Sequence, residues 1–253
     1  MAGLHEMIAE LDGLLDAATF KDYCPIGLQV EGRAEVERVV TGVSASAELF
    51  EAAITAGAGL VLTHHGLFWD GDDPRVIGSL RRRLALLLGA EVSLAAYHLP
   101  LDAHPEVGNN ALIARHLGAS LEEPFGIAAG RPVGWQARFP GEGIAASELV
   151  ARMAELTGRE PLAFLEGPER VRTVGIVSGS AGRLIFDALE AGFDAFVTGE
   201  AEEWSRAIAR ESTINAVFAG HHATETLGVK ALGEHLAARF GVEHRYVEID
   251  NPV

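Results

Sequence analysis

The chain has 253 residues, a formal net charge of −16 and a single cysteine, Cys24. One cysteine excludes an internal disulfide and a cysteine-rich zinc site, and the negative charge disfavours nucleic-acid binding, which needs a basic face. The N-terminus lacks the basic segment of a signal peptide, and no apolar run is long enough to cross a bilayer. We therefore expect a cytoplasmic protein that makes no contact with a membrane.

Helical and strand-like apolar patterns alternate along the chain. In the first part, the patterns predict helices at 4–17, 47–56, 74–88 and 105–117, and strands at 28–30, 36–43, 60–62 and 92–97. A less regular stretch, 119–168, contains a strand near 135–139, a helix near 147–156 and a strand near 162–165. The last part predicts strands at 171–177, 195–197, 216–218 and 246–249, and helices at 184–191, 202–210 and 225–240. This alternation predicts an α/β fold with a mostly parallel sheet.

An internal repeat relates two parts of the chain. "VTGVSASAELFEAAITAGAGLVLTH" begins at Val40 and "VGIVSGSAGRLIFDALEAGFDAFVTGE" begins at Val174, and both run from strand to Ser-x-Ser-Ala turn, helix and strand. A shared pattern of this length indicates duplication. We therefore expect one unit, 1–253, built from two related halves of about 1–125 and 126–253. The glycine-rich turn in the second copy is interpreted as a tight strand–helix connection, with an anion cradle of backbone amides as the alternative.

Three polar motifs follow predicted strands. His64 and His65 are adjacent, and two His-x-x-x-carboxylate motifs pair His98 with Asp102 and His221 with Glu225. The carboxyl ends of parallel strands border the usual ligand crevice of α/β folds, so these side chains are expected to gather there. Imidazoles and carboxylates suit zinc, iron, manganese or nickel. One histidine at a strand end is commonly structural, so the convergence of all three motifs carries the prediction of a metal site.

The candidate ligands are sufficient for two divalent ions per chain. His64 and His65 are expected to face opposite ways and to hold different ions, because successive strand residues alternate in direction. Glu225 is expected to bridge the ions, since a carboxylate has two oxygens that accept; it lies one helical turn beyond His221. His64 and His221 would then share one ion, and His65 and Asp102 the other.

Two further residues are interpreted as supports for these ligands. Glu200 occupies the repeat position of His65, and His98 opens the second motif. Each is expected to orient a metal ligand or to form the polar rim of the site. No residue is assigned as catalytic from the sequence. The basic cluster 81–83 is interpreted as a solvated helix face, with a phosphate contact as the alternative.

The motifs resemble those of the GTP cyclohydrolase I type 2 family, also called the NIF-three-like family, in its short bacterial form. The matching stretches are "GLQVEG", "THHGLFW", "HLPLDAHPEVGNN", "VTGE" and "AGHHATE". The resemblance implies the NIF-three-like fold, a homohexameric ring of dimers or trimers, and a dinuclear metal site. Its ligands, carried over motif by motif, are His64, His65, Asp102, His221 and Glu225. One departure is Ile26, which stands where the family usually has asparagine.

The resulting hypothesis is a metal-dependent hydrolase that acts on a small substrate. The resemblance implies a nucleotide and a reaction like that of GTP cyclohydrolase, in which metal-bound hydroxide opens the guanine ring and formate leaves. The first alternative is a non-catalytic metal-binding protein or a ring-shaped scaffold. The second is a ring protein associated with nucleic acid, which the charge of −16 disfavours.

Overall fold

The computed structural model describes residues 1–253, which form two compact units. Unit 1 comprises Met1–Leu101 and Gly228–Asp250, and unit 2 comprises Asp102–Leu227 and Asn251–Val253. The repeat predicts halves that divide near residue 125, and the descent of the two halves from one duplicated element stays a prediction. No helix combines the length and the apolar character that crossing a membrane requires.

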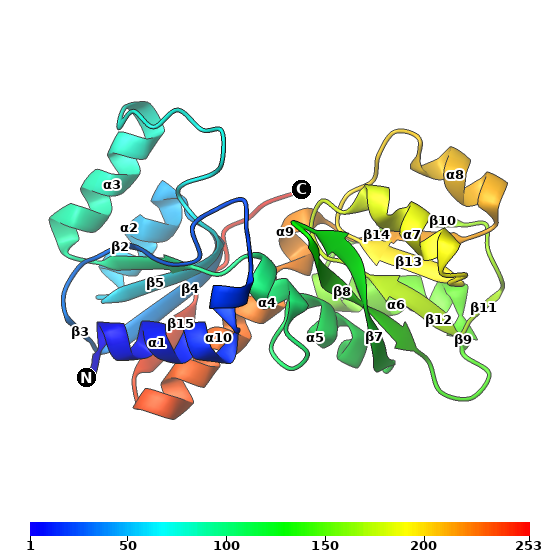
Figure 1. Ribbon diagram of the computed structural model, residues 1–253, viewed down its shortest axis with the longest axis horizontal. Helices are drawn as coiled ribbons and strands as arrows, with labels where there is room; N and C mark the ends of the chain where they lie inside the picture. The colour runs from blue at the N-terminus through cyan, green and yellow to red at the C-terminus, as the bar shows by residue number, and fades with distance from the viewer. The chain divides into compact units, whose positions relative to one another are not determined.

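Unit 1 contains a five-stranded sheet in the order β15-β4-β5-β6-β2 (Figure 1). Its strands are β2 (Gly27–Val30), β4 (Arg38–Ser44), β5 (Leu60–His65), β6 (Ser93–Ala96) and β15 (Glu243–Tyr246). Four of them run parallel, and only β2 is antiparallel to its neighbour β6. A separate two-stranded pair joins β1 (Ala2–Gly3) to β3 (Glu35–Val36). The parallel strands therefore end together at one edge of the sheet, beside His64 and His65.

Helices cover both faces of the sheet in unit 1. These are α1 (Leu4–Leu14), the 3-10 turn η1 (Ala17–Thr19), α2 (Ala47–Thr55), α3 (Gly78–Ala90) and α10 (Thr226–Phe240), whose first two residues belong to unit 2. α2 and α3 lie on one face and α1 and α10 on the other (Figure 1). Phe50 of α2 packs with Val61 of β5 in a buried cluster. Because both faces are covered, the central strands β4, β5 and β6 are buried along most of their length. Arg82 of the basic cluster lies 2.7 Å from Glu51, so this ion pair joins α3 to α2.

Unit 2 contains a six-stranded mixed sheet in the order β10-β14-β13-β12-β8-β7. Its strands are β7 (Ser120–Ala128), β8 (Arg131–Arg138), β10 (Leu162–Leu165), β12 (Thr173–Ile176), β13 (Ala195–Thr198) and β14 (Asn215–Phe218). Only β12, β13 and β14 are parallel to one another. A second pair joins β9 (Ile144–Ala145) to β11 (Arg170–Val171). As in unit 1, the three parallel strands end at one edge.

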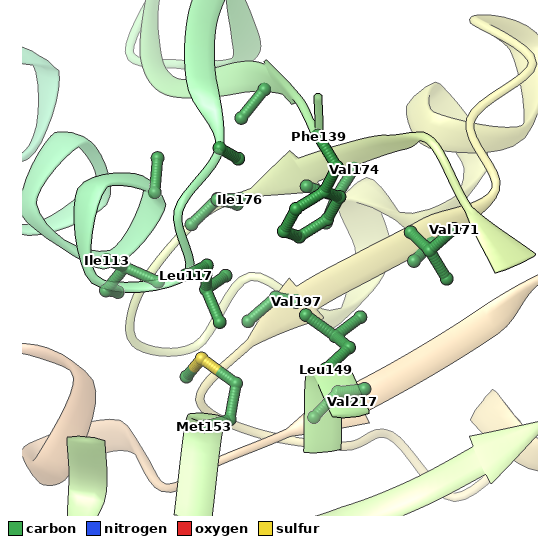
Figure 2. Close-up of a cluster of buried hydrophobic side chains, with 14 of the residues drawn as sticks. Ile113, Leu117, Phe139, Leu149, Met153, Val171, Val174, Ile176, Val197 and Val217 are labelled. Carbon is green, nitrogen blue, oxygen red and sulfur yellow. The ribbon is translucent and has the colours of Figure 1, made fainter. Parts of the chain in front are cut away.

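The core of unit 2 lies between this sheet and two helices. Leu149 and Met153, one turn apart on α6, share one buried cluster with Val174 and Ile176 of β12 (Figure 2). The helices of the unit are α5 (Asn109–His116), α6 (Ala146–Thr157), the 3-10 turn η2 (Gly182–Leu184), α7 (Ile185–Glu190), α8 (Ser205–Ser212) and α9 (His221–Thr224). The core is supplied by α5 and α6, whereas α7 and α8 cover the other face (Figure 1). The short helix α4 (Leu99–Ala103) crosses the boundary between the units.

The predicted α/β fold is confirmed, but the prediction of a mostly parallel sheet is wrong for unit 2. There, β7, β8 and β10 pair in antiparallel fashion. β7 was not predicted because "SLEEPFGIA" contains adjacent acidic residues and a proline, which are rare in strands. It forms nevertheless as an edge strand, where proline is tolerated, and Glu122 pairs with Arg138 of β8.

Several boundaries also differ from those predicted. The helix expected from residue 74 begins at Gly78, because the Asp73 carboxylate accepts the Arg75 N–H and forms a turn instead. The last strand is Glu243–Tyr246, because its pairing with β4 begins opposite Arg38. The helix expected from Glu225 is preceded by α9, so His221 is itself helical.

Candidate metal centre

His64 and His65 are the last two residues of β5 in unit 1, a strand that continues past its predicted end at Leu62. The Nδ1–H of His64 donates to the Tyr97 carbonyl, 3.0 Å away and just beyond β6. His65 Nδ1 lies 2.9 Å from the Ser44 hydroxyl at the end of β4. The ring centroids are 4.8 Å apart, so the expectation that the two side chains point in opposite directions is wrong. Hydrogen bonds to the two flanking strands hold both rings at the same end of the sheet.

His98 lies beside this pair. Its ring centroid is 4.9 Å from that of His64 and 5.6 Å from that of His65. Its Nδ1–H donates to Asp22 Oδ1 at 2.7 Å, and Asp22 Oδ2 accepts the backbone N–H of Leu99 at 2.8 Å. The Asp22 side chain is fully buried. Ring nitrogens of His64, His65 and His98 all lie within 4.8 Å of one another, which is a donor set able to hold a metal ion.

Unit 2 holds Asp102 in a fixed orientation. This carboxylate is 6% exposed, and its Oδ1 accepts hydrogen bonds from Asn109 Nδ2 at 2.8 Å and from Ser178 Oγ at 3.2 Å. Asn110 connects the same segments, since its side chain donates to the Asp102 carbonyl and accepts the Ser178 N–H. The amide and hydroxyl groups therefore hold the carboxylate in place.

His221 and Glu225 also lie in unit 2, just after β14. His221 Nδ1 donates to Glu200 Oε1 at 2.5 Å, and its Nε2 is 3.3 Å from Glu225 Oε1. Burial lowers the pKa of His221, but hydrogen bonds and charges from Glu225 and Glu200 outweigh burial and raise the pKa to about 9. Two carboxylates therefore favour positive charge at this imidazole. The same negative charges would also stabilise a bound divalent cation.

The glycine-rich turn of the second repeat contacts these groups. Gly179 has a φ of +68°, and a Cβ atom there would stand 2.3 Å from Glu225 Oε1. The Ser178 and Gly179 amides donate to Asn110 Oδ1 and Thr224 Oγ1, so they are not arranged as an anion cradle. The interpretation as a tight turn is therefore correct. The turn brings Ser178 to Asp102 and leaves room for Glu225.

The four imidazoles share one arrangement: each is bound at Nδ1 by a group of its own unit. The partners of Nδ1 are the Tyr97 carbonyl for His64, the Ser44 hydroxyl for His65, the Asp22 carboxylate for His98 and the Glu200 carboxylate for His221. Carbonyls and carboxylates only accept hydrogen bonds, which keeps a proton on Nδ1 of His64, His98 and His221 and leaves the lone pair of each neutral ring on Nε2. Histidines that bind metals are typically held in this way. The residues present therefore fit a divalent metal.

Within each unit, the site residues predicted from the sequence lie close together. His64, His65 and His98 meet in unit 1, and Asp102, Glu200, His221 and Glu225 surround the glycine-rich turn in unit 2. The sequence interpretation missed Asp22, Ser44 and Ser178. The repeat contained a signal for the two serines, because they occupy matching positions and each contacts a candidate ligand. No sequence pattern marks Asp22.

Comparisons with known proteins place the chain in a family. Residues 2–252 match the family Duf34/NIF3 (NGG1p interacting factor 3). A GTP cyclohydrolase 1 type 2 homolog of Pseudomonas aeruginosa is 45% identical and covers 98% of both chains. A protein of the same description from Allochromatium vinosum is 44% identical over 100% of this chain and 98% of its own.

Solved structures agree with this relationship. Protein ybgI, described as of unknown function, superposes with a TM-score of 0.94 at 38% identity over 100% of both chains. TTHA1606 from Thermus thermophilus gives a TM-score of 0.89 at 37% identity, again over 100% of both chains. Reduced HcgD from Methanocaldococcus jannaschii shares the fold, with a TM-score of 0.84 at 21% identity over 98% of both chains. The chain therefore belongs to the Duf34/NIF3 family.

Proposed function

We propose that the protein is a hydrolase with a dinuclear centre of divalent metal ions, held by His64, His65, Asp102, His221 and Glu225. The observation that carries the proposal is the shared arrangement of the imidazoles, each fixed at Nδ1 so that Nε2 is presented. Zinc, iron, manganese and nickel are all compatible with this donor set.

In the proposed centre, Glu225 would contact both ions, His64 and His221 would hold one ion, and His65 and Asp102 would hold the other. The buried Glu225 carboxylate lies beside His221 at the i,i+4 position, which supports a shared role for the two residues. Asp102, on a shorter side chain and held by Asn109 and Ser178, serves a single ion.

Bound divalent ions would supply Lewis acidity and lower the pKa of water toward neutrality. Neighbouring residues of the chain hold the proposed ligands in their orientations. Glu200 fixes the ring of His221, and Ser178 with Asn109 fixes the carboxylate of Asp102. The proposed substrate is a small molecule of the nucleotide class, and the proposed reaction is the opening of a purine ring with release of formate. The description of the relatives as GTP cyclohydrolase 1 type 2 homologs supports this choice.

Two further properties belong to the proposal. We expect a cytoplasmic protein and a homohexameric ring assembled from dimers or trimers, as the family resemblance implies. Native mass spectrometry of the purified full chain tests the assembly. A species of six chains agrees with the proposal, whereas a monomer at micromolar concentration contradicts it.

The experiment that tests the activity measures formate release from a panel of purine nucleotides. The protein is stripped with a chelator and reloaded separately with zinc, iron, manganese and nickel. We expect turnover that depends on metal and is lost in His65→Asn, while the exposed histidine variant His5→Asn retains it. Stoichiometric metal binding without turnover on any nucleotide would favour the alternative of a non-catalytic metal-binding or scaffold protein.

A further inference from the structure

We propose that His98 is an additional metal ligand, which shares a divalent ion with His64 and is held in place by the buried carboxylate of Asp22. This inference rests on the proposed metal centre and extends its ligand set by one imidazole in unit 1. The ring of His98 is closer to that of His64, at 4.9 Å between centroids, than to that of His65, at 5.6 Å. The ring nitrogens of all three lie within 4.8 Å of one another.

The surroundings of Asp22 make this role specific. A fully buried carboxylate costs free energy unless hydrogen bonds compensate for the lost water. Asp22 has two such bonds, from His98 Nδ1 at 2.7 Å and from the Leu99 amide at 2.8 Å. The Leu99 bond fixes the carboxylate relative to the backbone next to His98. Asp22 thereby acts as a positioning residue that sets both the direction and the tautomer of the ring.

The tautomer determines what His98 can bind. With the proton on Nδ1 donated to Asp22, the neutral ring has its lone pair on Nε2. The neighbouring imidazole of His64 is held in the same manner by the Tyr97 carbonyl, and His65 Nδ1 lies 2.9 Å from the Ser44 hydroxyl. A second imidazole nitrogen beside that of His64 suits a borderline cation such as Zn²⁺ or Co²⁺, for which histidine is a usual ligand.

Unit 1 also contains an exposed histidine–carboxylate pair, which can be compared with the buried pair of His98 and Asp22. His5 and Glu31 lie 3.1 Å apart, but their side chains are 71% and 64% exposed. His98 is 14% exposed and lies against the edge of Trp69, with ring centroids 5.3 Å apart. Partial burial beside other imidazoles is an environment that favours metal binding over a solvated ion pair. His5→Asn is therefore a matched control.

The test uses the full chain, stripped with a chelator and reloaded with Co²⁺, whose visible absorption reports on its ligands. His98→Asn and Asp22→Asn are compared with the wild type and with His5→Asn. We expect both site variants to bind one ion at least tenfold more weakly in competition with a chelator, and to change the Co²⁺ spectrum. The asparagine amide at position 22 would donate to His98 Nδ1 and move the ring proton to Nε2, so Asp22→Asn should resemble His98→Asn.

Two further measurements separate the possible outcomes. Thermal melts in excess chelator establish that each variant folds, and His98→Gln replaces His98→Asn if the latter does not. His65→Asn, measured in parallel, reports on the proposed centre itself. His65→Asn could lose an ion while the folded His98 variants keep the metal affinity and the Co²⁺ spectrum of the wild type. That result would refute the role of His98 and would leave the proposed metal centre supported. If the wild type binds no metal, the proposed function and this inference both fall.

Discussion

Hydrogen bonds behind the candidate ligands are the main feature at the scale of single residues. Ser44 and Ser178 occupy matching positions of the repeat, and they contact His65 and Asp102 respectively. Such outer partners orient a ligand, and their loss typically weakens metal binding by about 10- to 100-fold. The same reasoning applies to Glu200, which holds His221 from the side opposite Glu225.

Glu200→Gln should leave both metal ions bound but weaken their affinity by about tenfold. The glutamine oxygen can still accept the Nδ1–H of His221, but the negative charge that makes this imidazole a better donor is lost. We expect turnover to fall as well. Metal analysis and formate release on the same sample check both effects. Loss of both ions would show instead that Glu200 binds metal directly.

The pKa of His221 gives the metal-free protein a defined dependence on pH. Folding raises this pKa from 6.5 to about 9, so the folded state binds the proton more tightly than the unfolded state. The resulting stabilisation is fully present below pH 6.5 and is lost as the pH rises through about 9. We expect the free energy of unfolding in chelator to fall by ~2 kcal/mol over this range relative to His221→Asn. Parallel curves for the two proteins would contradict the raised pKa.

At the scale of elements, the turn between β12 and η2 has to leave space for Glu225. Gly179→Ala should strain the backbone, because φ is +68°, and should also displace the Glu225 carboxylate, which lies 2.3 Å from the position of a Cβ atom. Gly192→Ala is the matched control, since its φ is +72° and its Cβ would meet no atom within 4 Å. Both variants should lose ~1 kcal/mol of stability from backbone strain.

Only Gly179→Ala should also weaken metal binding, which chelator competition measures. Urea unfolding of both variants in chelator gives the cost of strain, which is common to them. Equal metal affinity in the two variants would mean that the turn does not control the position of Glu225.

Some helices and strands could be predicted from the sequence, and others could not. The strands that precede the polar motifs were predictable, because β5, β6 and β14 are short, mostly apolar runs that are buried. β7 and α4 were not, since one contains charged residues and proline and the other is too short to show helical spacing. The five proposed ligands follow from motifs at strand ends. Asp22 lies 76 residues before His98 and is brought to it only by folding.

At the scale of the whole molecule, the two units repeat one plan. Each contains three consecutive parallel strands, β4-β5-β6 in unit 1 and β12-β13-β14 in unit 2. The candidate ligands of each unit lie at or just after the ends of these strands. A duplicated element would explain why matching serines, Ser44 and Ser178, support ligands in both. The shared plan and the repeat both support the proposal of two related halves.

The central claim is that five ligands hold two ions with Glu225 as the bridge, and metal stoichiometry tests it most directly. Wild type, Glu225→Ala and His65→Ala are stripped, reloaded with excess zinc, freed of unbound metal and analysed by elemental mass spectrometry. We expect about two ions per chain in the wild type. His65→Ala should retain about one, and Glu225→Ala should bind both ions weakly and retain neither stoichiometrically. A wild-type content of one ion or none, or the loss of the same single ion in both variants, would contradict the account.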